Sequence, residues 1–283
     1  MDELSESPIL IFASGQRCGS TLLQRFLSSH PHVLIWGEHD GILLQLMTNF
    51  DHLYDWQYMF AHQLEVFVDD GYNNFVPNMN PPASYFSQAQ RNLISDLWRV
   101  PANEMGCPIW GFKEVLYGAE MARRIRQLFP GTRIIHLTRN IFDCFISLLH
   151  EERVTPEMQP HVPPHQVWTR ARTLDFIETW IHVNDSILNT QELEDSWVYR
   201  LTYEHMVQCP EQAMTHLTSW LGLNFSDFDL NVFKHKLYTD RHKGSDPRPK
   251  INRTDLSPEE ITLLTSPKIL RLSEQLNFDM TVA

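Results

Sequence analysis

The stretch that decides the fold runs from Ile9 to Thr21 and reads ILIFASGQRCGST. Its first five residues are apolar and predict a buried strand. Gly15 and Gly19 then allow a tight turn, and the apolar spacing after Ser20 and Thr21 is typical of a helix. A loop between a strand and a helix N-terminus presents free N–H groups and a positive dipole end to an anion. We therefore expect a phosphate or sulfate group as the ligand of residues 14–21, the phosphate loop.

The spacing within this loop argues against one common phosphate chemistry. A nucleotide triphosphatase loop has four residues between its glycines, followed by Lys and then Ser or Thr. Here three residues separate Gly15 from Gly19, no Lys precedes Ser20, and the cation of the loop is Arg17. An ordinary ATPase or kinase site is therefore disfavoured. A strand-to-helix turn that binds no ligand remains an alternative on this segment alone.

Composition limits the class of protein. The chain has 283 residues, of which 42% are hydrophobic, and a formal net charge of −12. That length suits one α/β domain with a large core, and the negative charge argues against nucleic-acid binding. The acidic residues 1–7 predict a flexible N-terminus without a signal peptide, and no apolar run is long enough to cross a membrane. These observations predict a cytoplasmic protein without a membrane partner.

Metal and disulfide chemistry find little support in the sequence. The four cysteines are scattered, with no spacing typical of a zinc or redox motif. Cys18 alone lies where a thiol could be activated, although a packing role is the simpler interpretation. His161 and His165 are separated by two prolines, which prevent the helix that would align them on a metal. We therefore predict no metal site.

Later strands add charged residues at the same edge of the expected sheet. Apolar runs at 33–36, 109–114 and 133–137 predict further parallel strands. Ligands of open α/β sheets lie at the carboxyl ends of the strands. Candidates there are Glu38, Lys113 and Arg139, with Ser147 on the following helix. Alternative interpretations are a helix-capping role for Glu38 and a solvated strand-end role for Lys113.

Three ordered segments make the chain resemble the sulfotransferases that use 3′-phosphoadenylyl sulfate (PAPS). Residues 14–23 resemble the family's loop for the 5′-phosphosulfate, and residues 134–143 with Ser147 resemble its 3′-phosphate site. Residues 198–206 followed by 220–223 are similar to its last strand and the helix behind it. Arg17 and the Gly37-Glu38 pair resemble the bacterial and protein-tyrosine branches more than the animal cytosolic branch. The resemblance implies one domain over 1–283 with a P-loop-type sulfotransferase fold, a central parallel sheet flanked by helices.

The resemblance also implies roles for individual residues. Glu38 would be the general base, with His39 as a possible substitute, while Lys113 and Arg17 would stabilise the transferred sulfuryl group or the leaving phosphate. Residues 48–108 and 153–168 would lie on the acceptor side, and 238–250 would close over the nucleotide. The residues expected to bind the donor are Gly15, Arg17, Cys18, Gly19, Ser20, Thr21, Arg139, Ser147, Tyr203, Arg241, Lys243 and Gly244.

The leading hypothesis is an enzyme that moves a sulfuryl group from PAPS to a hydroxyl or amine of a small molecule, such as a specialised metabolite, without a metal. Its nucleotide product would be adenosine 3′,5′-bisphosphate. The expected partner is the small-molecule acceptor, and a homodimer is one option. Two other functions stay open: an atypical nucleotide phosphotransferase and a non-catalytic nucleotide-binding module.

Overall fold

A computed structural model describes residues 2–154, 170–191, 193–194, 196–235 and 251–281. Most of the predicted acceptor-side loop at 153–168 lies outside these residues. The predicted nucleotide-closing loop at 238–250, with Arg241, Lys243 and Gly244, also lies outside them.

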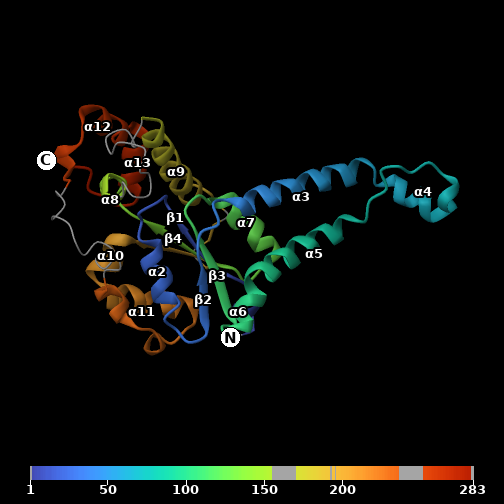
Figure 1. Cartoon of the computed structure of the whole chain (residues 1–283), viewed down its shortest axis with the longest axis horizontal. Coiled ribbons are helices and arrows are strands. Elements are labelled where there is room, and N and C mark those ends of the chain that lie inside the picture. Colours follow the sequence, from blue (N-terminus) through green and yellow to red (C-terminus); the bar gives the residue numbers. More distant parts are fainter. Residues whose placement is uncertain (1, 155–169, 192, 195, 236–250, 282–283) are drawn as a thin grey trace.

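The centre of the fold is a five-stranded parallel sheet (Figure 1). Its strands are β1 (Ile9–Ala13), β2 (Val33–Trp36), β3 (Ile109–Glu114), β4 (Arg133–Thr138) and β5 (Val198–Thr202). They are arranged in the order β2-β3-β1-β4-β5, and every neighbouring pair is parallel. The predicted α/β fold with a central parallel sheet is therefore confirmed.

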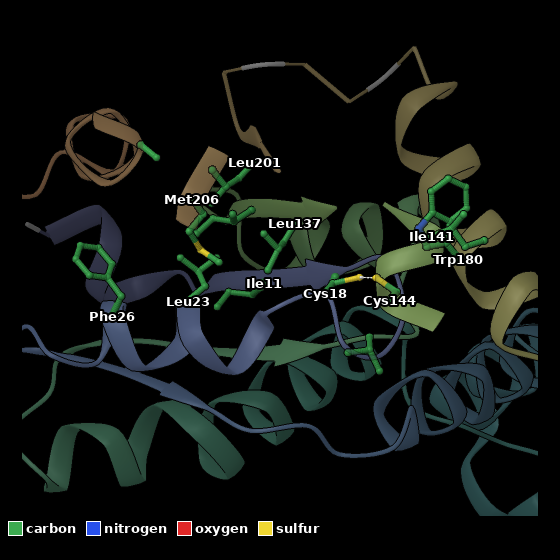
Figure 2. Packing of buried hydrophobic residues seen from close by; sticks show 14 of the residues in the cluster. Ile11, Cys18, Leu23, Phe26, Leu137, Ile141, Cys144, Trp180, Leu201 and Met206 are labelled. Atoms are coloured by element: carbon green, nitrogen blue, oxygen red, sulfur yellow. Dashed lines mark hydrogen bonds between the residues drawn. The ribbon is translucent and has the colours of Figure 1, made fainter. Parts of the chain in front are cut away.

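Helices cover both faces of the sheet, because the side chains of β1 alternate between two cores. Ile9, Ile11 and Ala13 pack in one core, together with residues of α2 (Ser20–Leu27), α8 (Ile141–Val154) and α11 (Pro210–Leu221). Figure 2 shows part of this core. Leu10 and Phe12 pack in the other core, with residues of α3 (Ile42–Met59) and α7 (Ala119–Leu128). Both faces of β1 are fully buried, which explains its continuous apolar sequence.

The helix α9 (Arg170–Leu188) contributes to both cores. Phe176, Ile177 and Trp180 belong to the core that contains α2, whereas Val183 and Ile187 belong to the core that contains α7. The segments that follow β1 and β4 both lie beside α9: a Cβ atom on Gly15 would lie 3.8 Å from Thr179 Cγ2, and Trp180 Nε1 donates to the Arg139 carbonyl.

An arm of three helices projects from the sheet (Figure 1). It consists of α3, α4 (His62–Asp70), a 3₁₀ turn at Gly71–Asn73 and α5 (Ala83–Ile94). No residue from 51 to 89 is buried, and several large apolar side chains there are exposed. Within the described part of the chain, no helix is long and apolar enough to span a membrane. The arm includes much of residues 48–108, which the sequence assigned to the acceptor side.

The N-terminus contains a helix where the sequence predicted a flexible segment. Helix α1 (Asp2–Glu6) buries Leu4, and the Ser5 carbonyl accepts a hydrogen bond of 3.3 Å from the indole of Trp110. Glu6 also forms an ion pair with Arg99. Tertiary contacts to β3 and to the helical segment around Arg99 thus order a stretch too short to be helical by itself.

The remaining elements are short helices and turns, most of them in the C-terminal part of the chain. The predicted short helices after Ser257 and Ser266 are present as α12 (Pro258–Leu264) and α13 (Pro267–Gln275). Both begin with proline, as helix N-termini favour. The others are a π-helical segment at Ser95–Arg99, α6 (Val100–Glu104), α10 (Tyr203–Gln208) and 3₁₀ turns at Phe225–Asp227, Leu230–Lys234 and Arg253–Asp255.

Candidate functional site

The phosphate loop leaves β1 and enters α2 through Gly19. This residue has a φ of +87°, and a Cβ atom on it would lie 2.3 Å from Cδ2 of Tyr203. Only glycine fits a left-handed residue that another side chain approaches so closely. Ser20 and Thr21 begin α2, so their amides belong to the first-turn N–H groups that lack a carbonyl partner within the helix. The loop therefore has the geometry expected of an anion-binding turn.

Two arginines and a serine from distant segments meet above this loop. Arg17 Nε donates to Ser147 Oγ at 3.2 Å, and Arg139 Nη1 donates to the Arg17 carbonyl at 2.7 Å. The Arg139 guanidinium lies over the ring of Tyr203, 4.2 Å from its centroid. Its Nε is buried and has no hydrogen-bond partner among the described residues. The predicted 5′ and 3′ segments of the donor site thus lie side by side, with an unused donor on Arg139.

A hollow of about 750 Å³ lies over the phosphate loop, and we call it the first hollow. Three arginines line it, and the carboxylate among the lining residues is Glu38. The lining consists of Gln16, Arg17, Gly19, Ser20, Thr21, Leu22, Arg25, Glu38, Arg139, Ser147, Tyr203, Val207, Phe233 and His235. Such an excess of guanidinium groups over carboxylates favours a ligand with several negative charges.

Some lining residues were not predicted from the sequence. Arg25 lies four residues after Thr21 on α2, so helical spacing could have placed both on one face. Phe233 and His235 lie near the loop through tertiary packing of a distant turn, and no sequence signal identifies them.

Glu38 follows β2 and forms an ion pair with Lys113 of β3. The two strands are neighbours, and Trp36 lies opposite Phe112, so the residues that follow leave the sheet together. The Lys113 side chain is 7% exposed and the Glu38 side chain 41%. Lys113 lines neither the first hollow nor the second one described below. In the structure Lys113 therefore contacts Glu38. The sequence analysis had instead expected Lys113 to stabilise the sulfuryl group or the leaving phosphate of the donor.

A second hollow of about 380 Å³ adjoins the first and shares Gln16 and Glu38 with it. Its other lining residues are His39, Asp40, Ile42, Glu114, Val115 and Leu116. Three of the lining residues are carboxylates and none is Lys or Arg. Glu38 thus stands between a hollow rich in arginine and a hollow rich in carboxylates.

His39 is half-buried beside Glu38. Burial lowers the pKa of its imidazole, although the charges of Glu114 and Glu38 act in the opposite direction. Its Nε2 lies 2.9 Å from the Tyr117 hydroxyl oxygen. Burial, followed by the charge of Glu114, raises the pKa of Tyr117 well above its usual value. At neutral pH the imidazole is therefore uncharged and the phenol protonated, a state in which His39 can accept a proton.

Cys18 is directed away from the site. Its side chain is fully buried, and its Sγ lies 3.4 Å from Cys144 Sγ and 3.3 Å from Ser14 Oγ (Figure 2). The first hollow does not include Cys18 in its lining. The sequence assigned Cys18 to donor binding, but its thiol packs into the core between the loop and α8. Any contribution of Cys18 to ligand binding comes from its backbone, and it is not placed to act as a nucleophile.

Gly15 also lies outside the lining of the first hollow. Its role in the loop is conformational, since its φ of +88° turns the chain directly after β1. Across the described residues, no group of three or more His, Cys, Asp or Glu side chains is arranged to hold a metal ion.

Comparisons with known proteins identify the family and the fold of the chain. A family model described as "Sulfotransferase family" matches residues 8–227. A sulfotransferase domain from the curacin biosynthetic pathway has a TM-score of 0.51 at 18% identity, covering 97% of this chain and 99% of its own. A sulfotransferase from Alicyclobacillus acidocaldarius has a TM-score of 0.51 at 14% identity, covering 96% of each chain. Sulfotransferase STF9 from Mycobacterium avium has a TM-score of 0.50 at 14% identity, covering 97% of this chain and 78% of its own.

These identities are low, so the solved structures establish the shared fold. No curated protein sequence matches the chain. The family model matches well over half of its residues, including the phosphate loop, Glu38, Lys113, Arg139 and Ser147. The chain belongs to the sulfotransferase family.

Proposed function

We propose that the protein transfers the sulfuryl group of PAPS to a hydroxyl or amine of a small molecule and releases adenosine 3′,5′-bisphosphate. The observation that carries the proposal is the pair of hollows that meet at Glu38. The first, with Arg17, Arg25 and Arg139 in its lining, suits a nucleotide with phosphates at both ends. The second offers room for an acceptor on the other side of the same carboxylate.

The reaction is an in-line displacement at sulfur. The acceptor oxygen or nitrogen forms a bond to sulfur while the bond between sulfur and the bridging phosphate oxygen breaks. The electron pair of that bond stays on the 5′-phosphate, and Glu38 takes the proton that the acceptor loses. Glu38 lines both hollows, so its carboxylate reaches the boundary at which this transfer occurs.

Stabilisation of developing charge comes from groups already fixed around the phosphate loop. Arg17 donates to Ser147, and the first-turn amides of Ser20 and Thr21 in α2 would donate to the leaving phosphate as its charge grows. Arg139, fixed over Tyr203, has its buried Nε available for the 3′-phosphate. Lys113 contributes through its ion pair with Glu38, which holds that carboxylate in place beside both hollows.

The acceptor is a neutral or cationic small molecule. The second hollow has carboxylates at Glu38, Asp40 and Glu114 and an apolar part formed by Ile42, Val115 and Leu116. The surrounding sequence has the same character, because residues 26–90 contain no Lys or Arg. An anionic acceptor would be repelled by the negative charge of these carboxylates.

The two alternatives have less support. A phosphotransferase would need an acidic metal ligand near the loop, but Asp143 lies within α8 and pairs with Arg253 at 3.3 Å. A binding module explains the arginines but gives no role to the carboxylate shared by both hollows.

Isothermal titration calorimetry with adenosine 3′,5′-bisphosphate tests the proposal, with ATP and magnesium run in parallel. We expect tight binding of the bisphosphate without metal, and a loss of about 100-fold or more in Arg139→Ala, because a charge-assisted phosphate contact disappears. Arg133→Ala is the matched control, since Arg133 lies at the other end of β4 and donates to the Ser196 carbonyl. Preference for magnesium-ATP would overturn the assignment of the donor.

Glu38→Gln then separates an enzyme from a binding module. We expect sulfation of an acceptor, found by a screen with labelled PAPS, to fall by about 100-fold or more in this variant. Bisphosphate affinity should stay close to wild type, because the change removes a proton acceptor and leaves the arginines in place. Unchanged turnover in Glu38→Gln would show that Glu38 is not the base.

A further inference from the structure

Glu114, the last residue of β3, is a fully buried acidic residue that the mechanism above does not use. A carboxylate without exposure to water is costly unless its oxygens accept hydrogen bonds. Its neighbour Lys113 pairs with Glu38, so it does not compensate Glu114 directly. The compensation comes from the backbone of the segment that carries Glu38.

Three backbone amides donate to this carboxylate. Oε2 accepts from the N–H groups of His39 and Gly41, each at 3.2 Å, and Oε1 accepts from the N–H of Val115 at 2.8 Å. Two of these three donors belong to residues 37–41, the segment between β2 and α3, which we call the Glu38 loop. Glu114 therefore links the Glu38 loop to the C-terminal end of β3 through these hydrogen bonds.

The conformation of the loop explains why a carboxylate is needed there. Asp40 and Gly41 have φ values of +53° and +69°, so two consecutive residues adopt the left-handed region. Backbone N–H groups in such turns converge into a concavity that binds an anion. In this protein the Glu114 side chain supplies the anion and so stabilises a loop conformation that is otherwise strained.

Glu38 needs such support because burial does not hold it. Its side chain is 41% exposed, and its described contact is with Lys113. Lys113 fixes the carboxylate end of Glu38, while Glu114 fixes the backbone on the C-terminal side of the same residue. Adjacent residues of β3 thus hold the side chain and the backbone of Glu38 separately, and its direction toward both hollows depends on the two contacts together.

We propose that Glu114 is a positioning residue that orients Glu38 for proton abstraction through the Glu38 loop. The inference rests on the proposed function, in which Glu38 is the base. Glu114 lines the second hollow, but its oxygens are occupied by backbone amides, so its effect reaches the reaction through Glu38. Small displacements of a reacting group are costly in catalysis, up to about 100-fold for roughly 1 Å.

The test is a double-mutant cycle between Glu114→Gln and Glu38→Gln. Glutamine keeps the size of the side chain but replaces one acceptor oxygen by an NH₂ group that opposes an N–H. We expect kcat to fall about 10- to 100-fold in Glu114→Gln, with the affinity for adenosine 3′,5′-bisphosphate within about twofold of wild type. Adding Glu114→Gln to Glu38→Gln should cause no further loss, because the base is already absent.

A second measurement does not depend on activity. Amide hydrogen exchange of His39 and Gly41 should be slow in the wild type and faster in Glu114→Gln, because the acceptor of these amides has changed. Thr132→Val is the matched control, since it also removes a buried hydrogen bond, the one of 2.6 Å from Thr132 Oγ1 to the Phe129 carbonyl. Thr132 directly precedes β4, at the amino ends of the strands and so away from the Glu38 loop. We expect neither kcat nor exchange at the Glu38 loop to change in this variant.

Either of two results would overturn the inference: a wild-type kcat in Glu114→Gln, or a loss that multiplies with that of Glu38→Gln. If Glu114→Gln does not fold, Glu114→Asp replaces it, since a shorter carboxylate keeps the charge but withdraws from the loop amides and should lower kcat partially. Failure of the wild type to bind the bisphosphate or to use PAPS would refute the proposed function instead. Unchanged exchange in the Glu114 variants would still refute the positioning role in that case.

Discussion

Gly19 lies where the phosphate loop turns into α2 and passes the ring of Tyr203. We expect Gly19→Ala to destabilise the protein by about 1–2 kcal/mol through its left-handed φ. Displacement of the Tyr203 ring should add about 1–3 kcal/mol, because a Cβ atom would lie 2.3 Å from it. Bisphosphate binding should weaken as well, since Tyr203 supports the Arg139 guanidinium. Thermal unfolding and calorimetry measure the two effects.

Gly106→Ala is the matched control for this residue. Gly106 also has a left-handed φ, +81°, but a Cβ atom there would meet nothing within 4 Å. The difference between the two variants therefore reports the contact with Tyr203. Equal losses of stability in both variants would show that the ring moves aside without cost.

At the scale of secondary-structure elements, the outer part of the arm, residues 57–84, contributes to neither core of the sheet. No residue from 51 to 89 is buried, and Tyr54 contacts Phe86 and Ser87 across the two long helices. We expect replacement of residues 57–84 by a short Gly-Ser turn to shift Tm by no more than about 2 °C, because little apolar surface loses its burial. Differential scanning calorimetry makes the comparison. A fall of about 10 °C would show that the arm supports the core.

The arm takes no part in the first hollow, where the donor is proposed to bind. The first hollow contains no residue between 39 and 138, so bisphosphate affinity should be unchanged by the replacement. The second hollow includes Ile42, the first residue of α3, which the replacement retains. Weaker bisphosphate binding would contradict the independence of the arm.

For the molecule as a whole, buried histidine links stability to pH. Burial lowers the pKa of His136 to about 3, against the opposing effect of its hydrogen bond with Asn184. In the unfolded chain a histidine has a pKa near roughly 6.5. Between these values the unfolded chain binds a proton that the folded protein excludes. Stability is therefore complete above about pH 6.5 and decreases as the pH falls toward 3, by up to about 1.4 kcal/mol per pH unit.

Urea denaturation at several pH values between 7 and 4 tests this linkage. We expect His136→Gln, which retains a donor for the Asn184 oxygen, to show a flatter decrease in the free energy of unfolding than the wild type. His52→Gln is the control, because His52 lies on the exposed face of α3. Parallel curves for the wild type and His136→Gln would refute the role of His136.

Requirements on burial and backbone conformation within a few residues explain which parts of the fold could be predicted from the sequence. The continuous apolar sequence of β1 specifies a strand buried on both faces, and the left-handed turn at Gly19 accepts only glycine. The sequence predicted most strand positions well, because each strand is a short apolar run bounded by turn residues. It also predicted Ser147 near Arg139, since the two residues are about two helical turns apart, and both line the first hollow.

The sequence by itself determined the phosphate loop, the parallel sheet and the residues at its carboxyl edge, because backbone and periodicity rules act within a few residues. Only the tertiary structure decided how those residues are used. The order of strands places β3 beside β2, so Lys113 pairs with Glu38 and Glu114 holds the Glu38 loop. Packing of α8 against the loop directs Cys18 into the core. Contacts between residues 75 or 126 positions apart depend on how the sheet is assembled, and a local pattern carries no information about that assembly.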